Sequence, residues 1–253
     1  MKIYRFLDTN APRVGVGERD RIWRYDGSDA LDLGKVEEAR PLPLAEARLL
    51  TPVVPGKIVC VGRNYADHAK ELGNDAPSEP IIFLKPPSAL LPPGGTIVRP
   101  AQSERVDFEG ELAIIIKRRA RNVSRDEWRD YVLGFTCAND VTARDLQKRD
   151  VQFTRAKGFD TFLPLGPCIA TDLDPSSLEI TTRVNGEVRQ HGNTAQMIFP
   201  CDLLLEFISA VMTLEPGDVI LTGTPAGVGP MNAGDEVEVE IEGIGILANV
   251  VAE

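Results

Sequence analysis

The chain has 253 residues, of which 43% are hydrophobic and 26% charged, so it can bury the core of a globular protein and is unlike a disordered chain. Lys and Arg number 28 against 38 Asp and Glu, a net charge of −10, so no basic face is expected for nucleic acid or for an anionic membrane surface. The excess acid is either ordinary solvated surface or includes carboxylates gathered around a cation.

Targeting and redox features of the sequence favour the cytoplasm. No apolar stretch approaches the roughly 18 residues that a membrane helix needs, and residues 1–5 lack the apolar region of a signal peptide. The four cysteines are far apart and form no metal-binding pair. We expect buried free thiols in a reducing compartment rather than disulfides or a zinc site.

The first part of the chain is predicted to form short strands. Strand patterns cover residues 2–7, 13–17 and 21–25, and four prolines between residues 41 and 56 indicate irregular chain. We therefore expect a small N-terminal β domain over residues 1–52 and a larger domain over residues 53–253.

The remainder of the chain is predicted to contain more strands than helices. Ser124 and Glu127 have the spacing of a capping box, and Asn185-Gly186 is a strong hairpin signal between two strand patterns. Because the helices do not alternate regularly with the strands, we expect a β-rich α+β fold rather than a doubly wound sheet. The expected strands cover 57–61, 81–85, 109–117, 132–138, 179–184, 187–190, 219–221, 236–241 and 245–251, and the expected helices cover 64–72, 124–131, 142–149 and 200–214.

Two carboxylates stand two residues apart at the start of an apolar strand. Side chains at this spacing share one face of a strand, so Glu109 and Glu111 lie together, and Asp107 joins them if the strand begins early enough. Near a core, both stay ionised only if a cation compensates their repulsion. The alternative is a pair of solvent-facing acids on an edge strand.

A third carboxylate, Asp140, ends another apolar strand and precedes a predicted helix, where it is also well placed as an N-cap. Arg144 and Gln147 are three residues apart on that helix and face one direction. Three carboxylates beside an Arg and a Gln suit an oxygen-rich anion next to a hard divalent cation. Mg²⁺ fits best, with Mn²⁺ or Ca²⁺ as alternatives.

A candidate base is provided by His68 and Glu71, which meet on one helical face. A carboxylate in that position orients the imidazole and raises its basicity, as a general base requires. The only other histidine, His191, has no evident partner. Lys157 precedes an apolar stretch and can supply positive charge to a developing enolate, unless it is a solvated loop lysine.

A Gly-rich turn covers residues 222–230. It lacks the spacing of a nucleotide-binding motif, but its backbone N–H groups and threonines are suited to hold a carboxylate. The chain contains no G-x-S-x-G elbow, which weakens a serine hydrolase interpretation.

Six segments in order resemble the fumarylacetoacetate hydrolase family: VGRNYADHAKE, FLKPPSAL, DFEGELAIII, CANDVTARDLQ, AKGFDTFLPLG and GDVILTGTPAGVGPM, between residues 61 and 231. The resemblance implies a mixed β-roll catalytic domain, a small N-terminal β domain and a homodimer. It implies an Mg²⁺ or Mn²⁺ site at Glu109, Glu111 and Asp140, and a water-activating pair at His68 and Glu71. Substrate and oxyanion groups would fall on Arg144, Gln147, Lys157 and Thr224, with Arg63 and Tyr65 as further substrate-binding candidates.

The expected activity is metal-dependent C–C bond hydrolysis of a small 2-oxo or dicarboxylic acid of the acylpyruvate type, through an enolate. The alternatives are isomerisation of 2-hydroxy-dienedioates or decarboxylation of oxaloacetate-like acids, as in aromatic-compound catabolism. A rival from another class is a catalytically silent metal-binding module. A glycosidase is disfavoured, because carboxylates two apart on one strand cannot flank a sugar bond from opposite faces.

Overall fold

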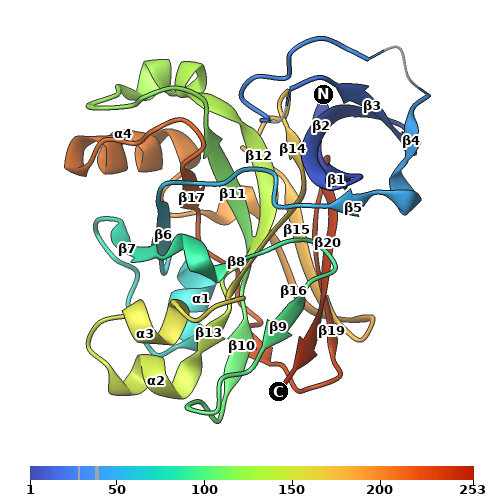
Figure 1. Ribbon diagram of the computed structural model, residues 1–253. Coiled ribbons are helices and arrows are strands. Elements are labelled where there is room, and N and C mark those ends of the chain that lie inside the picture. Colours follow the sequence, from blue (N-terminus) through green and yellow to red (C-terminus); the bar gives the residue numbers. More distant parts are fainter. Residues whose placement is uncertain (28, 38–39) are drawn as a thin grey trace.

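The computed structural model describes residues 1–27, 29–37 and 40–253 (Figure 1). The strands are β1 (Lys2–Asp8), β2 (Ala11–Glu18), β3 (Arg21–Tyr25), β4 (Leu42–Pro43), β5 (Arg48–Leu49), β6 (Ile58–Gly62), β7 (Ile81–Lys85), β8 (Leu90–Leu91), β9 (Thr96–Val98), β10 (Val106–Phe108), β11 (Gly110–Ile116), β12 (Val132–Asn139), β13 (Thr142–Ala143), β14 (Leu163–Ala170), β15 (Glu179–Val184), β16 (Glu187–Asn193), β17 (Val219–Leu221), β18 (Gly229–Pro230), β19 (Glu236–Ile241) and β20 (Gly245–Ala252). The α-helices are α1 (Ala66–Glu71), α2 (Arg144–Arg149), α3 (Thr154–Lys157) and α4 (Cys201–Val211), and the 3-10 helices are η1 (Leu44–Glu46), η2 (Pro87–Ala89), η3 (Arg125–Tyr131) and η4 (Thr194–Gln196).

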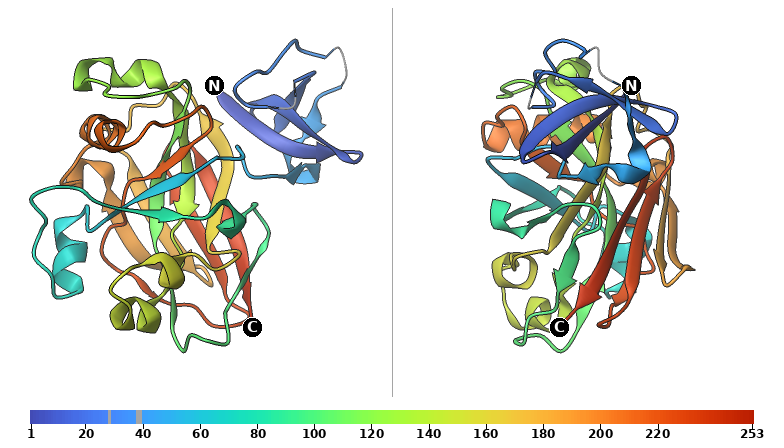
Figure 2. Two further views of the ribbon diagram at one scale, coloured as in Figure 1. Left: turned by 60° about the vertical axis from the view of Figure 1, so that its left-hand side comes forward. Right: turned by 45° about the vertical axis from the view of Figure 1, so that its right-hand side comes forward.

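The largest sheet begins with the N-terminal strands and continues through the rest of the protein. Its order is β4-β3-β2-β1-β14-β12-β11-β17-β6-β7, with β5 paired to β1 and β8 to β14. Strand β1 pairs antiparallel with β14 through Lys2 and Ile3, which joins the N-terminal strands to the rest of this sheet. The N-terminal strands lie at the opposite end of the molecule from α2 and α3 (Figure 2). The division near residue 52 stays a prediction.

Strand β11 is buried on both faces and forms the centre of the core. Leu112, Ile114 and Ile116 pack in one cluster with α4 and with the five-stranded sheet β16-β15-β19-β20-β9. Ala113 and Ile115 pack in a second cluster on the other face. Burial of both faces explains why the strand is a continuous apolar run rather than an alternating pattern.

The hairpin and thiol predictions are confirmed. Asn185 and Gly186 have φ values of 53° and 78°, the left-handed pair that a tight two-residue turn requires, and β15 and β16 pair across them. The four cysteines are free and buried. Among the described residues, no helix is both long and apolar enough to cross a membrane.

The helix predicted over 124–131 forms as a 3-10 helix, but the predicted capping box is wrong. The 3-10 helix covers Arg125–Tyr131, and the side chain of its N-cap residue, Ser124, makes no capping hydrogen bond. The Ser124 hydroxyl instead donates to the Glu127 carboxylate at 2.9 Å. Because these two side chains satisfy each other, neither caps the backbone N–H groups that a capping box would cover.

The helix predicted over 142–149 begins two residues late. Thr142 and Ala143 form β13, in which Thr142 pairs with Asp107 of β10, so the backbone stays extended until α2 begins at Arg144. The N-cap of α2 is Ala143, and the N-cap role considered for Asp140 is therefore wrong. Asp140 remains at the end of β12, where its side chain is available for other contacts.

Candidate active site

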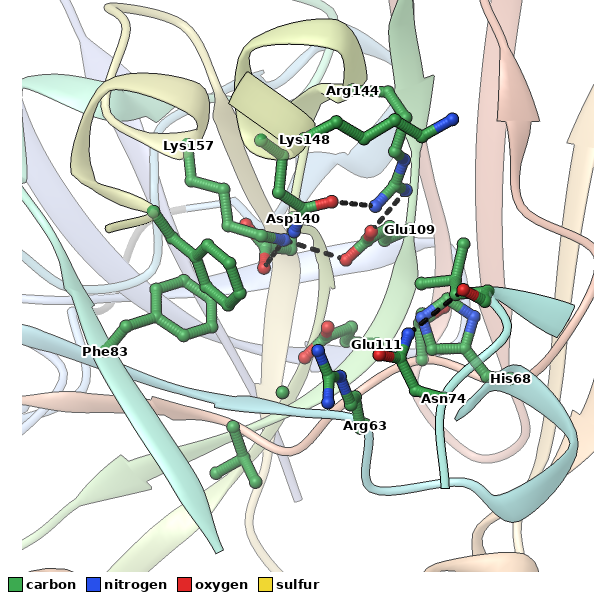
Figure 3. Close-up of a pocket in the computed structure, with 16 residues that line it drawn as sticks. Arg63, His68, Asn74, Phe83, Glu109, Glu111, Asp140, Arg144, Lys148 and Lys157 are labelled. Atoms are coloured by element: carbon green, nitrogen blue, oxygen red, sulfur yellow. Dashed lines mark hydrogen bonds and ion pairs between the residues drawn. The ribbon is translucent and has the colours of Figure 1, made fainter. Parts of the chain in front are cut away.

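One pocket collects the predicted chemical groups from distant parts of the chain (Figure 3). It encloses about 210 Å³, less than the ~300–1,000 Å³ typical of sites for drug-sized ligands, so it suits a small molecule. Its lining residues come from β6, α1 and the loop after it, β7, the β10–β11 and β12–β13 junctions, α2, α3 and the Gly-rich turn: Val61, Gly62, Arg63, His68, Leu72, Asn74, Phe83, Glu109, Glu111, Asp140, Arg144, Gln147, Lys148, Phe153, Lys157 and Thr224.

The three predicted metal ligands converge at the floor of this pocket. Glu109, Glu111 and Asp140 are all buried, and their ligand atoms lie within 4.8 Å of one another. Strand pairing causes the convergence: Gly110 is opposite Asn139 in the β11–β12 ladder, and the Asp140 N–H donates to the Glu109 carbonyl at 2.9 Å. We name these three residues the carboxylate triad. Asp107 lies outside it.

Gly110 allows the five-stranded sheet to approach the triad. A Cβ atom at this position would lie 2.2 Å from the Thr182 hydroxyl oxygen, so no larger residue fits without movement. The Gly110 N–H donates to Gln190 Oε1 at 3.0 Å, and Gln190 Nε2 donates to the Thr224 hydroxyl at 2.7 Å. Gln190 was not predicted, because its partners lie far away in sequence.

Lys157 is buried between two members of the triad and is no solvated loop lysine. Its Nζ donates to Glu109 Oε2 at 2.9 Å, to Asp140 Oδ2 at 2.6 Å and to the Thr142 hydroxyl at 2.8 Å. Lys85 donates to Asp140 Oδ1 at 2.6 Å and is also buried. Lys85 was not predicted, although a lysine that ends an apolar strand directly before two prolines was an available signal.

Arg144 holds two acidic side chains in place. Its guanidinium donates to Asp107 Oδ2 at 2.9 Å, to Glu109 Oε1 at 2.5 Å and to Gln147 Oε1 at 2.6 Å. Arg144 and Gln147 therefore face one direction, as their spacing predicts. The buried guanidinium already has protein acceptors, so its contribution to the site includes fixing the position of Glu109.

The two glutamates of the triad have opposite electrostatic surroundings. Burial opposes ionisation of Glu109, but Lys157 and Arg144 overcome it and hold the Glu109 pKa well below its usual range. Burial raises the pKa of Glu111 well above its usual range, and repulsion from Asp140 and Glu109 raises it further. Among the described residues, Glu111 has no cationic partner and accepts the Gly223 N–H at 2.7 Å. A hard divalent cation fits this oxygen donor set and would supply the missing positive charge.

His68 and Glu71 form the predicted pair on α1. His68 Nδ1 lies 3.4 Å from Glu71 Oε2, and His68 is buried in the pocket lining. The Glu71 carboxylate also accepts the Gly227 N–H at 3.1 and 3.2 Å. The Gly-rich turn therefore does hold a carboxylate through its backbone, as its composition indicates, and that carboxylate belongs to Glu71.

The remaining predicted substrate-binding residues occupy different places. The buried Thr224 hydroxyl donates to the Gly110 carbonyl at 2.8 Å. Tyr65 is buried, does not line the active-site pocket, and lines a separate small pocket with His191; burial raises its pKa. Arg63 is half-buried and lines the active-site pocket. His191 is exposed and has Thr181 as a partner, with Nδ1 3.3 Å from the hydroxyl.

Comparisons with known proteins agree with this fold. A family model described as fumarylacetoacetate (FAA) hydrolase C-terminal matches residues 57–252, and one described as Rv2993c-like, N-terminal, matches residues 1–52. The human protein named oxaloacetate tautomerase FAHD2A, mitochondrial, is 47% identical over 223 residues, which are 83% of this chain and 71% of that protein.

Solved structures of similar proteins cover the whole chain. The crystal structure of 5-carboxymethyl-2-hydroxymuconate delta-isomerase from Mycobacterium smegmatis has a TM-score of 0.91 at 44% identity, over 100% of this chain and 99% of that one. Fumarylacetoacetate hydrolase from psychrophilic Exiguobacterium antarcticum has a TM-score of 0.90 at 40% identity, again over 100% and 99%. The β-rich α+β fold is confirmed, and the chain belongs to the fumarylacetoacetate hydrolase family.

Proposed function

We propose that the protein is a divalent-metal-dependent enzyme that acts on 2-oxo or enol carboxylic acids, with C–C bond hydrolysis of an acylpyruvate-type acid as its first candidate reaction. One observation carries this proposal: His68, which Glu71 contacts, lines the same small pocket as the carboxylate triad. A general base and a site for a Lewis acid within one small pocket are the two components that such chemistry needs.

The triad of Glu109, Glu111 and Asp140 is the proposed ligand set. Carboxylate oxygens with open positions suit Mg²⁺, with Mn²⁺ or Ca²⁺ as alternatives. When bound, the cation would polarise the 2-oxo group and stabilise negative charge on its oxygen.

The protein's own groups supply the proton transfer and further charge. Glu71, held by the Gly227 N–H, contacts Nδ1 of His68 and so leaves Nε2 to accept a proton. In hydrolysis that proton comes from a water, whose oxygen attacks the distal carbonyl carbon. The C–C bond then breaks, and its electron pair passes to the departing enolate. The buried Lys157 ammonium adds positive charge beside this group.

A second candidate is isomerisation by proton transfer, and the names of two similar proteins favour it. One is called an oxaloacetate tautomerase and the other a delta-isomerase. In that reaction His68 would take a proton from carbon rather than from water. Decarboxylation of an oxaloacetate-like acid would use the same enolate, without attack by water and without removal of a proton from carbon.

The proposal also covers the cellular location, the substrate and the oligomeric state. Four buried free thiols support a reducing, cytoplasmic location, and the substrate is a small 2-oxo or dicarboxylic acid. We further propose a homodimer, as the family resemblance implies. Sedimentation equilibrium would test the assembly, and a mass of 27.6 kDa would contradict it.

The experiment that tests the proposed function compares His68→Ala with the wild type in Mg²⁺. Acetylpyruvate cleavage and the keto–enol conversion of oxaloacetate are measured in parallel, which separates hydrolysis from isomerisation. Loss of a general base should lower kcat by roughly 10²–10⁴-fold. His191→Ala removes the other, exposed histidine and serves as the matched control. Undiminished turnover by His68→Ala would show that His68 is no base.

A further inference from the structure

Arg63 differs from the other cations that line the active-site pocket. Lys157 and Arg144 each donate to triad carboxylates within 2.9 Å, and Lys148 is exposed to solvent. Arg63 is half-buried, and within the part of the chain that the structure describes its guanidinium has no ion pair and no hydrogen bond. Its positive charge is therefore free to meet an anionic ligand.

The backbone at Arg63 is held in a conformation that non-glycine residues rarely adopt. Its φ is +57°, and the next residue fixes the chain there. The Asn64 side chain donates to the carbonyls of Phe199 at 3.0 Å and Thr222 at 2.7 Å, and accepts the Phe199 N–H at 2.8 Å. Such strain persists only where surrounding contacts impose it, and it concentrates at functional sites. Here it accompanies a side chain that enters the pocket.

The position of Arg63 matches the far end of a ligand held at the triad. In Figure 3 its guanidinium lies on the opposite side of the carboxylates from Arg144 and Lys157. Phe83 and Phe153, whose rings pack edge to face at 5.5 Å, form an apolar wall of the same pocket. A charged end group would avoid this wall, because it would lose hydration there without gaining a partner.

We propose that Arg63 binds a second carboxylate of the substrate and so selects 2-oxo dicarboxylates over 2-oxo monocarboxylates. The planar guanidinium matches a carboxylate through two parallel N–H···O bonds. Partial burial strengthens this contact, whereas the exposed Lys148 ammonium competes with water. The inference rests on the proposed function, because it assumes that the 2-oxo end of the ligand lies at the triad.

The proposed preference for dicarboxylates is tested by calorimetric titration of the Mg²⁺-saturated protein with two five-carbon ligands. 2-Oxoglutarate and 2-oxopentanoate share the 2-oxo acid end and differ in whether the far end carries a carboxylate. The wild type should bind 2-oxoglutarate about tenfold to a hundredfold more tightly, the range expected for hydrogen bonds between charged groups. Arg63→Met should remove this preference while leaving the affinity for 2-oxopentanoate within about twofold, and Arg63→Lys should keep part of it.

Lys148→Met is the matched control, since it removes the same charge from the pocket rim and should retain the preference. The proposal is overturned if the wild type shows no preference or if the preference survives Arg63→Met. It is also overturned if Arg63→Met lowers the affinity for both ligands equally, or if Lys148→Met abolishes the preference. Turnover assays separate this result from the proposed function. A preference for 2-oxoglutarate without turnover of any 2-oxo acid supports the proposed role of Arg63 and contradicts the proposed reaction. Turnover without the preference supports the reaction and contradicts the role of Arg63.

Discussion

Lys157 lies between Glu109 and Asp140, with its Nζ 2.9 Å from one carboxylate and 2.6 Å from the other. Burial lowers the pKa of this lysine, but the two carboxylates outweigh it and hold the pKa above the ordinary value. The ammonium therefore stays charged. Lys157 is at once a structural partner of the triad and a source of positive charge in the pocket.

Lys157→Met should destabilise the protein strongly. It would leave two buried carboxylates without their shared partner, which typically lowers the free energy of unfolding by ~3–5 kcal/mol. Urea denaturation monitored by circular dichroism would measure the change. Lys117→Met, at an exposed position, should change the free energy of unfolding by less than about 0.5 kcal/mol. Equal stability of the two variants would contradict a charged, paired Lys157.

Mg²⁺ should raise the melting temperature of the wild type, and Glu111→Ala should abolish this rise. A ligand at a hundred times its Kd stabilises the folded state by ~2.7 kcal/mol, which corresponds to several degrees for a chain of this size. Differential scanning calorimetry with and without EDTA makes the comparison, and Glu236→Gln, at an exposed strand position, is the control. Stabilisation by Mg²⁺ without turnover of any 2-oxo acid would favour the catalytically silent module.

Gly110→Ala should impair both folding and metal binding. The new methyl group would lie 2.2 Å from the Thr182 hydroxyl oxygen and 3.2 Å from Val239 Cγ1, so these side chains of the five-stranded sheet must shift. Overpacking of this kind costs ~1–3 kcal/mol. At Gly229 an added Cβ would make only ordinary contact, at 3.6 Å from the Phe108 ring. If Gly229→Ala lowers the denaturation midpoint as much as Gly110→Ala, the close approach has no special role.

The four thiols should not react with Ellman's reagent in the native protein at pH 8. Burial raises the pKa of Cys168 to about 11 and that of Cys201 to about 12, and raises those of Cys60 and Cys137 well above the ordinary value. Below these pKa values the thiols stay protonated, and the reactive thiolate is absent. All four should react once guanidinium unfolds the chain. Rapid modification at pH 8 under native conditions would show that a thiol is accessible.

Local spacing was enough to predict the groups that lie close together in the chain. Strand side chains repeat every two residues, which predicts that Glu109 and Glu111 point to one place, and they do so although Glu109 lies just before β11. His68 and Glu71 meet because helical side chains three apart are neighbours. These relationships need only the local conformation, so the sequence by itself determined them, together with the β-rich character and the Asn185-Gly186 turn.

Tertiary structure decided the contacts that join distant segments. Lys85 and Asp140 are 55 residues apart, and Gln190 and Gly110 are 80 apart; no local periodicity connects such pairs. The start of α2 likewise depends on a distant segment, because pairing of Thr142 with Asp107 of β10 keeps the chain extended before the helix. Local conformational preferences determine which helices and strands form, but sheet pairing and burial determine where these elements end and which elements they contact. The carboxylate triad is thus predictable as a set of residues, whereas the presence of Lys85 and the pairing of each cation with a particular carboxylate follow only from the fold.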